Sequence, residues 1–232
     1  MTRLRAWSGR HFACLLHGGC GSSSAGRPPF AADRPARSRH QRPADRLRLH
    51  LESHADALAV ALTSAGVTGA ELIAHSMGGS VAIVLAARHP HLVSRLVLVD
   101  ANLDPIPATP ASGGSSGIAA YSEQEFLTDG GEEVRDRAGS HWWSTMRLAG
   151  RDALHRSAIH LTRGTVPTMR ELLLDLKIPR TYLLPETDGP LPGTDALTEA
   201  GVSVVAIPDC GHNIMLDNPE AFARASAAAL AN

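Results

Sequence analysis

The sequence predicts an α/β fold, in which a mostly parallel central sheet is flanked by helices and interrupted by one helical insertion. Short apolar strands alternate with helices over most of the 232 residues, which is the pattern of a parallel sheet covered on both faces. The alternation stops between residues 104 and 176, where a proline- and glycine-rich stretch precedes several helical segments. We therefore expect a core made of residues 1–103 and 177–232 and a helical insertion at residues 104–176.

Each element follows from its residue pattern. Strands are expected where short apolar runs occur, and helices where longer runs rich in alanine and leucine occur; the first helix should end near Gly66. In chain order, the expected strands span 4–7, 12–16, 71–74, 96–99, 181–184 and 202–207, and the expected core helices span 51–62, 80–87 and 219–230. Within the insertion we expect helical segments near 122–126, 141–148 and 167–174.

Composition narrows the class of protein. An apolar content of 44% over 232 residues is enough for one globular domain with a sizeable core. No run approaches the roughly 18 apolar residues that cross a bilayer, and no apolar stretch of signal-peptide length follows the basic start, so we expect no membrane span and a cytoplasmic location. Cys14, Cys20 and Cys210 show no paired or metal-ligand spacing, which favours a reducing compartment and no metal.

The charge is unevenly distributed. Residues 1–50 contain ten arginines against Asp33 and Asp45, and such a basic block is one sign of a nucleic-acid partner. These arginines are scattered through proline-rich sequence without interleaved aromatic residues or a nucleic-acid-binding motif. We therefore expect no nucleic-acid partner.

The stretch Ala74-His75-Ser76-Met77-Gly78-Gly79 joins an apolar strand to an apolar helix. Small residues two positions before and after Ser76 allow a sharp turn at this junction, which would project the serine Oγ above the sheet. The backbone N–H of Met77 would then be free at the start of the helix. The stretch predicts a nucleophile elbow, with alanine in place of the more common glycine at its first position.

Two further motifs supply the partners that a serine nucleophile needs. The glycine-rich turn after the strand at 12–16 exposes backbone N–H groups, and the N–H of Gly19 with that of Met77 would form a two-donor oxyanion site. His212 lies in the loop after the strand at 202–207, where a general base would sit. A serine hydroxyl needs such a base, and the base needs a carboxylate that fixes its tautomer.

With these three motifs in order, the chain resembles the α/β-hydrolase fold family, and in particular its lid-bearing serine hydrolases of the esterase and lipase type. The resemblance implies hydrolysis of an ester, thioester or lactone carbonyl through a Ser-His-Asp triad and an acyl-enzyme, with a small-molecule acyl substrate and no cofactor. It implies that the insertion is a lid. Acyl transfer or carbon–carbon bond hydrolysis on the same triad are alternatives, and a catalytically silent ligand-binding protein is an alternative of another class. The oligomeric state is left open.

Two aspartates compete for the role of the acid. Asp188 follows the strand at 181–184 and matches the family's Gly-Glu-x-Asp pattern, with Pro185 in place of the glycine. Asp100 stands directly at the tip of the strand at 96–99, where some members of the family carry their acid. We expect Asp188 to be the acid, with Asp100 as the alternative.

Two more features concern the pocket. Trp142, Trp143 and Met146 lie within one and a half helical turns, so we expect them to present an apolar surface to the substrate; packing of the insertion against the core is the alternative. The stretch Asp33–His40 keeps the aspartate of the family's Asp-x-x-Gly-x-Gly-x-Ser loop and loses both glycines. Its alteration would open the site, reshape its specificity or mark a decayed enzyme.

Overall fold

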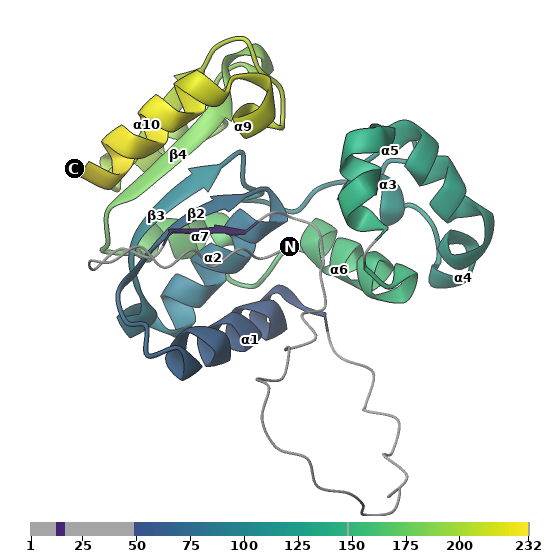
Figure 1. Cartoon of the computed structure of the whole chain (residues 1–232), viewed down its shortest axis with the longest axis horizontal. Helices are drawn as coiled ribbons and strands as arrows, with labels where there is room; N and C mark the ends of the chain where they lie inside the picture. Colours follow the sequence, from purple (N-terminus) through teal and green to yellow (C-terminus); the bar gives the residue numbers. More distant parts are fainter. Residues whose placement is uncertain (1–12, 17–48, 148, 232) are drawn as a thin grey trace, which may run out of the picture.

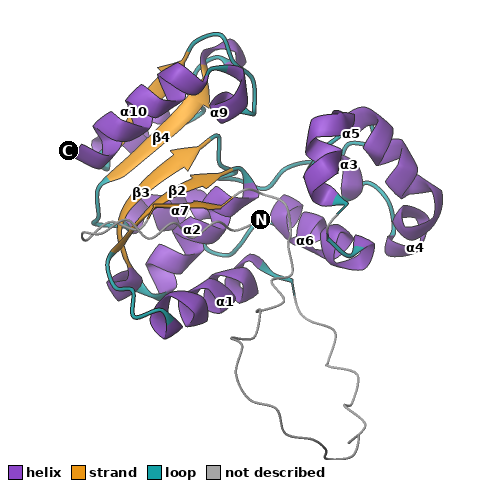
Figure 2. Cartoon of the chain, in the orientation of Figure 1, coloured by secondary structure: helices purple, strands orange, loops and turns teal. Residues whose placement is uncertain are grey.

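The computed structural model describes residues 13–16, 49–147 and 149–231, and the described strands form one parallel sheet (Figures 1 and 2). The strands lie in chain order across the sheet: β1 (Ala13–Leu16), β2 (Ala70–His75), β3 (Val93–Val99), β4 (Arg180–Pro185) and β5 (Val202–Ile207). All four neighbouring pairs are parallel. The carboxyl ends of the strands therefore meet at one edge of the sheet. The strand expected at 4–7 lies outside the described residues.

Helices cover both faces of the sheet. One face carries α1 (Leu51–Ser64), α2 (Met77–Arg88), α7 (Met169–Asp175) and α8 (Thr194–Glu199), and the other carries α9 (Ile214–Asp217) and α10 (Pro219–Ala231). A short 3₁₀ turn, Pro90–Leu92, precedes β3. Connections between parallel strands are right-handed. Each connection here leads to the next strand in the same direction across the sheet, so the helices that connect the strands lie on one face, that of α2.

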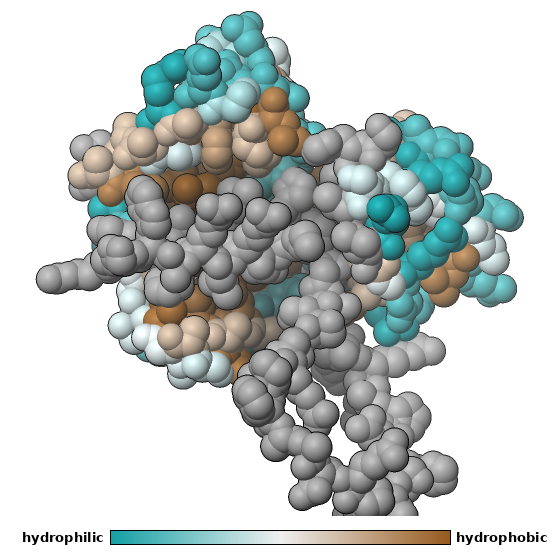
Figure 3. All heavy atoms as spheres, in the orientation of Figure 1, coloured by the Kyte–Doolittle hydropathy of each residue, from teal (hydrophilic) through white to brown (hydrophobic). Residues whose placement is uncertain are grey.

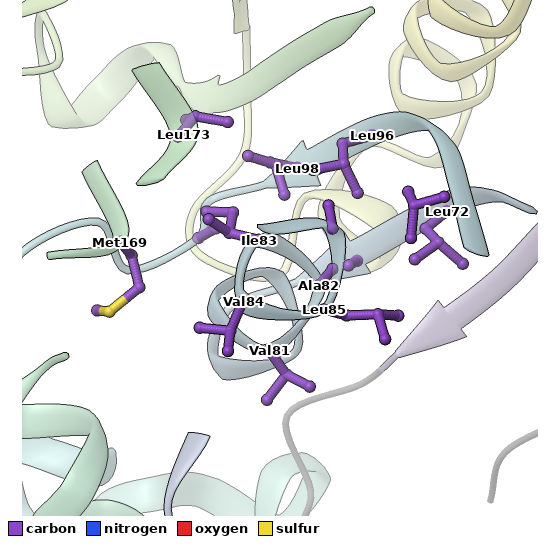
Figure 4. Packing of buried hydrophobic residues seen from close by; sticks show 14 of the residues in the cluster. Leu72, Val81, Ala82, Ile83, Val84, Leu85, Leu96, Leu98, Met169 and Leu173 are labelled. Carbon is purple, nitrogen blue, oxygen red and sulfur yellow. The ribbon is translucent and has the colours of Figure 1, made fainter. Parts of the chain in front are cut away.

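Alternating side chains of the strands build the two core layers. Leu96 and Leu98 of β3 pack with the helices on the α2 face, while Val97 and Val99 pack with those on the α10 face. Because both faces are covered, the last four residues of β3 are all buried. In Figure 4, Ile83 of α2 lies toward Leu98 of β3, whereas Val81 and Val84 point away from these strands.

The segment between β3 and β4 forms a helical lobe beside the core (Figure 1). It contains α3 (Ser115–Ile118), α4 (Glu123–Glu125), a π-helical turn at Phe126–Gly130, α5 (Gly131–Met146) and α6 (Arg151–Arg163). The lobe has its own apolar cluster, which includes Ile118, Phe126 and Val134. On the face seen in Figure 3, its surface is mainly hydrophilic. α7 packs with α2 through Met169 and Leu173, although the sequence-based boundary at residue 176 places it in the insertion.

Histidines line the contact between core helix α1 and insertion helix α6. The rings of His50 and His160 lie 3.5 Å apart between centroids, and His54 Nε2 is 3.2 Å from Ser157 Oγ. Burial lowers the pKa of His54, and the pKa of His160 is lowered first by burial and then by His50 and Arg163, against a smaller opposing effect of Glu52. The contact therefore favours neutral imidazoles.

We expect the folded protein to lose stability on acidification through this contact. Since the folded pKa values of His54 and His160 lie below the ordinary value, the unfolded chain binds more protons, so their contribution is complete above about pH 6.5 and is lost as the pH falls below it. Thermal unfolding followed between pH 7.5 and 5 should show a smaller decrease of the midpoint in the double variant His54→Gln, His160→Gln than in the wild type. His91→Gln, at an exposed histidine of the Pro90–Leu92 turn, is the control and should retain the wild-type decrease. Equal pH dependence in all three proteins would contradict the assignment.

Candidate active site

Backbone strain marks the carboxyl edge of the sheet. Among the described residues other than glycine, three have a positive φ: Ser76 at 54°, Asp100 at 43° and Asp209 at 52°. Ser76 directly follows β2, Asp100 directly follows β3, and Asp209 lies in the loop after β5. Such conformations cost about 1–3 kcal/mol each and gather at functional sites. Their shared position indicates that this edge is the site.

Ser76 occupies a sharp turn between β2 and α2. Its backbone N–H still donates to Val99 O of the neighbouring strand at 3.0 Å, while its φ and ψ of 54° and −128° turn the chain into α2. Gly79 permits this turn because the helix lies directly against the chain after β3: a Cβ at Gly79 would stand 2.3 Å from Ala101 Cβ. The small residues of the motif thus allow the elbow to approach the Asp100 segment.

Asp100 is held by hydrogen bonds on both sides. Its N–H donates to Leu183 O of β4 at 2.8 Å. The next carbonyl, Ala101 O, accepts from the buried hydroxyl of Tyr182 at 2.6 Å, and Asn102 O accepts from Ser80 Oγ at 2.7 Å. Burial, and after it the charge of Asp100, raises the pKa of Tyr182, so this hydroxyl remains a donor. Sequence reasoning missed Tyr182 and Ser80, since their partners are backbone atoms distant in the chain.

His212 links the serine and the aspartate. Its Nδ1 lies 2.5 Å from Asp100 Oδ2, and its Nε2 lies 3.1 Å from Ser76 Oγ. A carboxylate accepts hydrogen bonds, so Nδ1 carries the proton and Nε2 presents a lone pair to the serine hydroxyl. This is the arrangement in which a serine becomes a nucleophile.

The loop that carries His212 is fixed by several contacts. Gly211 N–H donates to Asp217 Oδ2 at 3.0 Å, and Asn218 Nδ2 donates to Pro208 O at 2.9 Å. Cys210 is buried, and its thiol donates to Ile207 O at 3.2 Å. Burial and the surrounding carboxylates raise the pKa of this thiol, which keeps it protonated. These contacts hold the loop from the side of β5 and α9.

Asp188 is not the partner of His212 in the structure. It ends an exposed 3₁₀ turn, Glu186–Asp188, whose contact with the His212 loop is made by Thr187 Oγ1, which donates to Cys210 O at 3.0 Å. The expected pairing of Asp188 with His212 is therefore corrected to Asp100. The reason is register: Asp100 is the first residue after its strand and still bonds to β4, whereas Asp188 lies three residues beyond the end of β4.

The remaining candidate residues are only partly placed. Met77 begins α2 and is buried, and Gly19 and the stretch Asp33–His40 lie outside the described residues. Met146 is 1% exposed within the insertion's own cluster, and the half-buried Trp143 packs against that cluster. These two side chains thus pack inside the insertion, and the side chain of Trp142 lies outside the described residues.

In the part of the chain that the structure describes, no helix is long and apolar enough to cross a membrane. Over the same residues, no group of three or more His, Cys, Asp or Glu side chains is arranged to hold a metal ion.

Comparison with known proteins matches part of the chain to one family. A family model described as alpha/beta hydrolase fold matches residues 5–116. Among curated proteins, the chain is 35% identical over 124 residues to an sn-1-specific diacylglycerol lipase ABHD11 of Xenopus laevis, which is 48% of this chain and 38% of that protein. It is 40% identical over 65 residues to the Mus musculus protein of the same name, 28% of this chain and 20% of that protein. The matches thus span well under half of these relatives' length.

Solved structures extend the likeness to most of the chain. An esterase from Exiguobacterium antarcticum superposes with a TM-score of 0.62 at 16% identity, covering 80% of this chain and 75% of that one. A thermophilic esterase from Thermogutta terrifontis gives a TM-score of 0.60 at 21% identity, covering 78% and 72%. At these identities the likeness concerns the fold alone.

Proposed function

The chain has the α/β-hydrolase fold, and we propose that it is a serine hydrolase that cleaves an ester, thioester or lactone carbonyl through an acyl-enzyme. The observation that carries the proposal is the position of His212 between Ser76 and Asp100, at 3.1 and 2.5 Å. Strained backbone supports the proposal, because Ser76 and Asp100 both have a positive φ and both side chains contact His212.

The geometry supports the following reaction. Ser76 Oγ attacks the substrate carbonyl while His212 Nε2 takes its proton, and Asp100 stabilises the imidazolium that forms at Nδ1. The negative charge on the carbonyl oxygen is stabilised by the N–H of Met77 and, in this proposal, that of Gly19. His212 then protonates the leaving group, and water activated by the same histidine releases the acid from Ser76.

The substrate class is proposed from the site and the relatives together. The curated relatives are diacylglycerol lipases, so glycerolipid esters are the first natural class to test. We propose that the insertion at residues 104–176 acts as a lid. Trp143 and Met146 pack in the insertion's own apolar cluster, so a substrate-facing role is tested for Trp142 alone. Acyl transfer and carbon–carbon bond hydrolysis use the same triad and are distinguished by product analysis.

We expect the purified chain to hydrolyse p-nitrophenyl esters and to accumulate an acyl-enzyme. The measurement is a panel of p-nitrophenyl esters, acyl thioesters and a 1,2-diacylglycerol of increasing acyl length, together with labelling by a fluorophosphonate probe. A burst of nitrophenol equal to the enzyme concentration and stoichiometric labelling are the expected results. Binding of a substrate analogue without turnover or labelling would instead support the silent ligand-binding protein.

A further inference from the structure

The residue before the nucleophile touches the loop of the base. His75, the last residue of β2, is buried, and its Nε2 lies 2.8 Å from the backbone oxygen of His212. A carbonyl oxygen only accepts, so the Nε2 of His75 is protonated and donates. The two imidazole rings also contact each other, with centroids 4.5 Å apart and planes inclined at 45°.

This contact supports a side chain that is half exposed to solvent. The side chain of His212 is 48% exposed, so packing alone holds its ring weakly. The loop anchors at Asp217 and Asn218 lie on its β5 and α9 side. His75 reaches the loop from the opposite side, at the backbone of His212 itself.

His75 also directly precedes Ser76 in the chain. It therefore links the proposed nucleophile, Ser76, to the proposed base, His212. β2 fixes His75 within the sheet, and the next residue is the proposed nucleophile. A hydrogen bond from His75 to the backbone of His212 therefore sets the position of the His212 ring relative to Ser76 Oγ. The separation of 3.1 Å between His212 Nε2 and Ser76 Oγ depends on that position. Displacement of a reacting group by about 1 Å can cost about a hundredfold in rate.

We infer that His75 is a positioning residue for His212: its Nε2–H holds the backbone of the base so that the imidazole reaches Ser76 and Asp100 together. The inference rests on the proposed serine-hydrolase function and adds a residue outside the triad. The hydrogen bond, rather than the bulk of the ring, carries the effect.

Three replacements separate these contributions. His75→Phe keeps a ring of similar size and removes the donor, His75→Gln keeps an N–H at the reach of Nε2, and His75→Asn carries the same amide one methylene shorter. We expect His75→Phe and His75→Asn to lower kcat for a p-nitrophenyl ester about 10- to 100-fold with KM changed less than about threefold. His75→Gln should remain within about threefold of wild type.

A matched control lies in the insertion. His155 is also buried, and its Nε2 makes the same kind of contact, 2.8 Å from Tyr121 O. His155→Phe removes an equivalent hydrogen bond away from the triad, so it should lower the thermal midpoint without the 10- to 100-fold fall in kcat expected of His75→Phe. A general loss of activity from deleting any buried histidine would appear in this variant too.

Two readouts identify positioning through His212. The Nδ1 proton shared between His212 and Asp100 should give a low-field proton NMR resonance that shifts or broadens in His75→Phe and not in His75→Gln. In a His212→Ala background, His75→Phe should cause no further decrease in the rate of fluorophosphonate labelling, because the residue that it positions is gone.

The outcomes are distinct from those of the proposed function. A wild-type protein that is neither labelled nor active overturns the proposed function and this inference with it. An active wild type with unchanged kcat in His75→Phe, or an equal additional loss in the His212→Ala background, overturns the inference alone. If His75→Phe does not fold, the comparison of His75→Asn with His75→Gln decides: similar rates in these two overturn the inference.

Discussion

Replacing Ser76 by alanine is expected to lower ester turnover by roughly six orders of magnitude, the loss seen when the nucleophile of a triad is removed. The fold should persist, because the backbone contact of Ser76 with Val99 O does not involve its side chain. The measurement is kcat/KM for the best p-nitrophenyl ester, with thermal unfolding recorded on the same samples. Retained turnover in folded Ser76→Ala would contradict the account.

Ser226→Ala is the control for this experiment. Ser226 is a buried serine on α10, on the far side of the sheet from α2. Its removal tests whether losing any buried serine hydroxyl affects activity, and we expect turnover to remain at the wild-type level.

The second large effect is expected for Asp100. Asp100→Asn should lower turnover by roughly three to four orders of magnitude, because an amide at Nδ1 favours the imidazole tautomer that cannot accept the proton of Ser76. Asp188→Asn should cost less than about tenfold, since Thr187 rather than Asp188 bonds to the His212 loop. The measurement is kcat/KM for both variants, with circular dichroism as evidence of folding.

The opposite order of effects would return the role of the acid to Asp188. The double variant resolves an intermediate result: small losses in both single variants and collapse in the double variant would show that one carboxylate replaces the other. Asp188 is close enough for its charge to raise the pKa of Cys210 alongside Asp100, so this outcome is worth measuring.

Short motifs in the sequence predict part of the site, but they do not predict the contacts that depend on the register of neighbouring strands. The proximity of Ser76 and His212 could be predicted because each lies in a short motif whose geometry depends on its immediate neighbours. The choice between Asp100 and Asp188 depends on the backbone hydrogen bonds at the carboxyl ends of the strands. The N–H of Ser76 donates to Val99 O, and the N–H of Asp100 donates to Leu183 O. Those partners lie far apart in the chain, so a single sequence offers no signal for them.

A different limit, weak local periodicity, explains which helices were missed. α6 buries Leu154, Ala158 and Leu161 at helical spacing, but arginines and histidines between them obscure the apolar pattern. The short helix α8 buries only Leu197 and leaves little periodicity to recognise. Strands β2 to β5 were predictable to within a few residues, because each is a short, mostly apolar run.

The measurement that tests the central claim most directly is the location of the acyl group. Brief reaction with p-nitrophenyl acetate, acid quenching and tandem mass spectrometry of the digested protein should find one acetyl group on the peptide containing Ser76, at the serine oxygen. The acetylated fraction should fall sharply in His212→Ala and in Asp100→Asn, and remain near wild type in Asp188→Asn. Acetylation of another residue, or turnover without any acetylated Ser76, would contradict the triad of Ser76, His212 and Asp100.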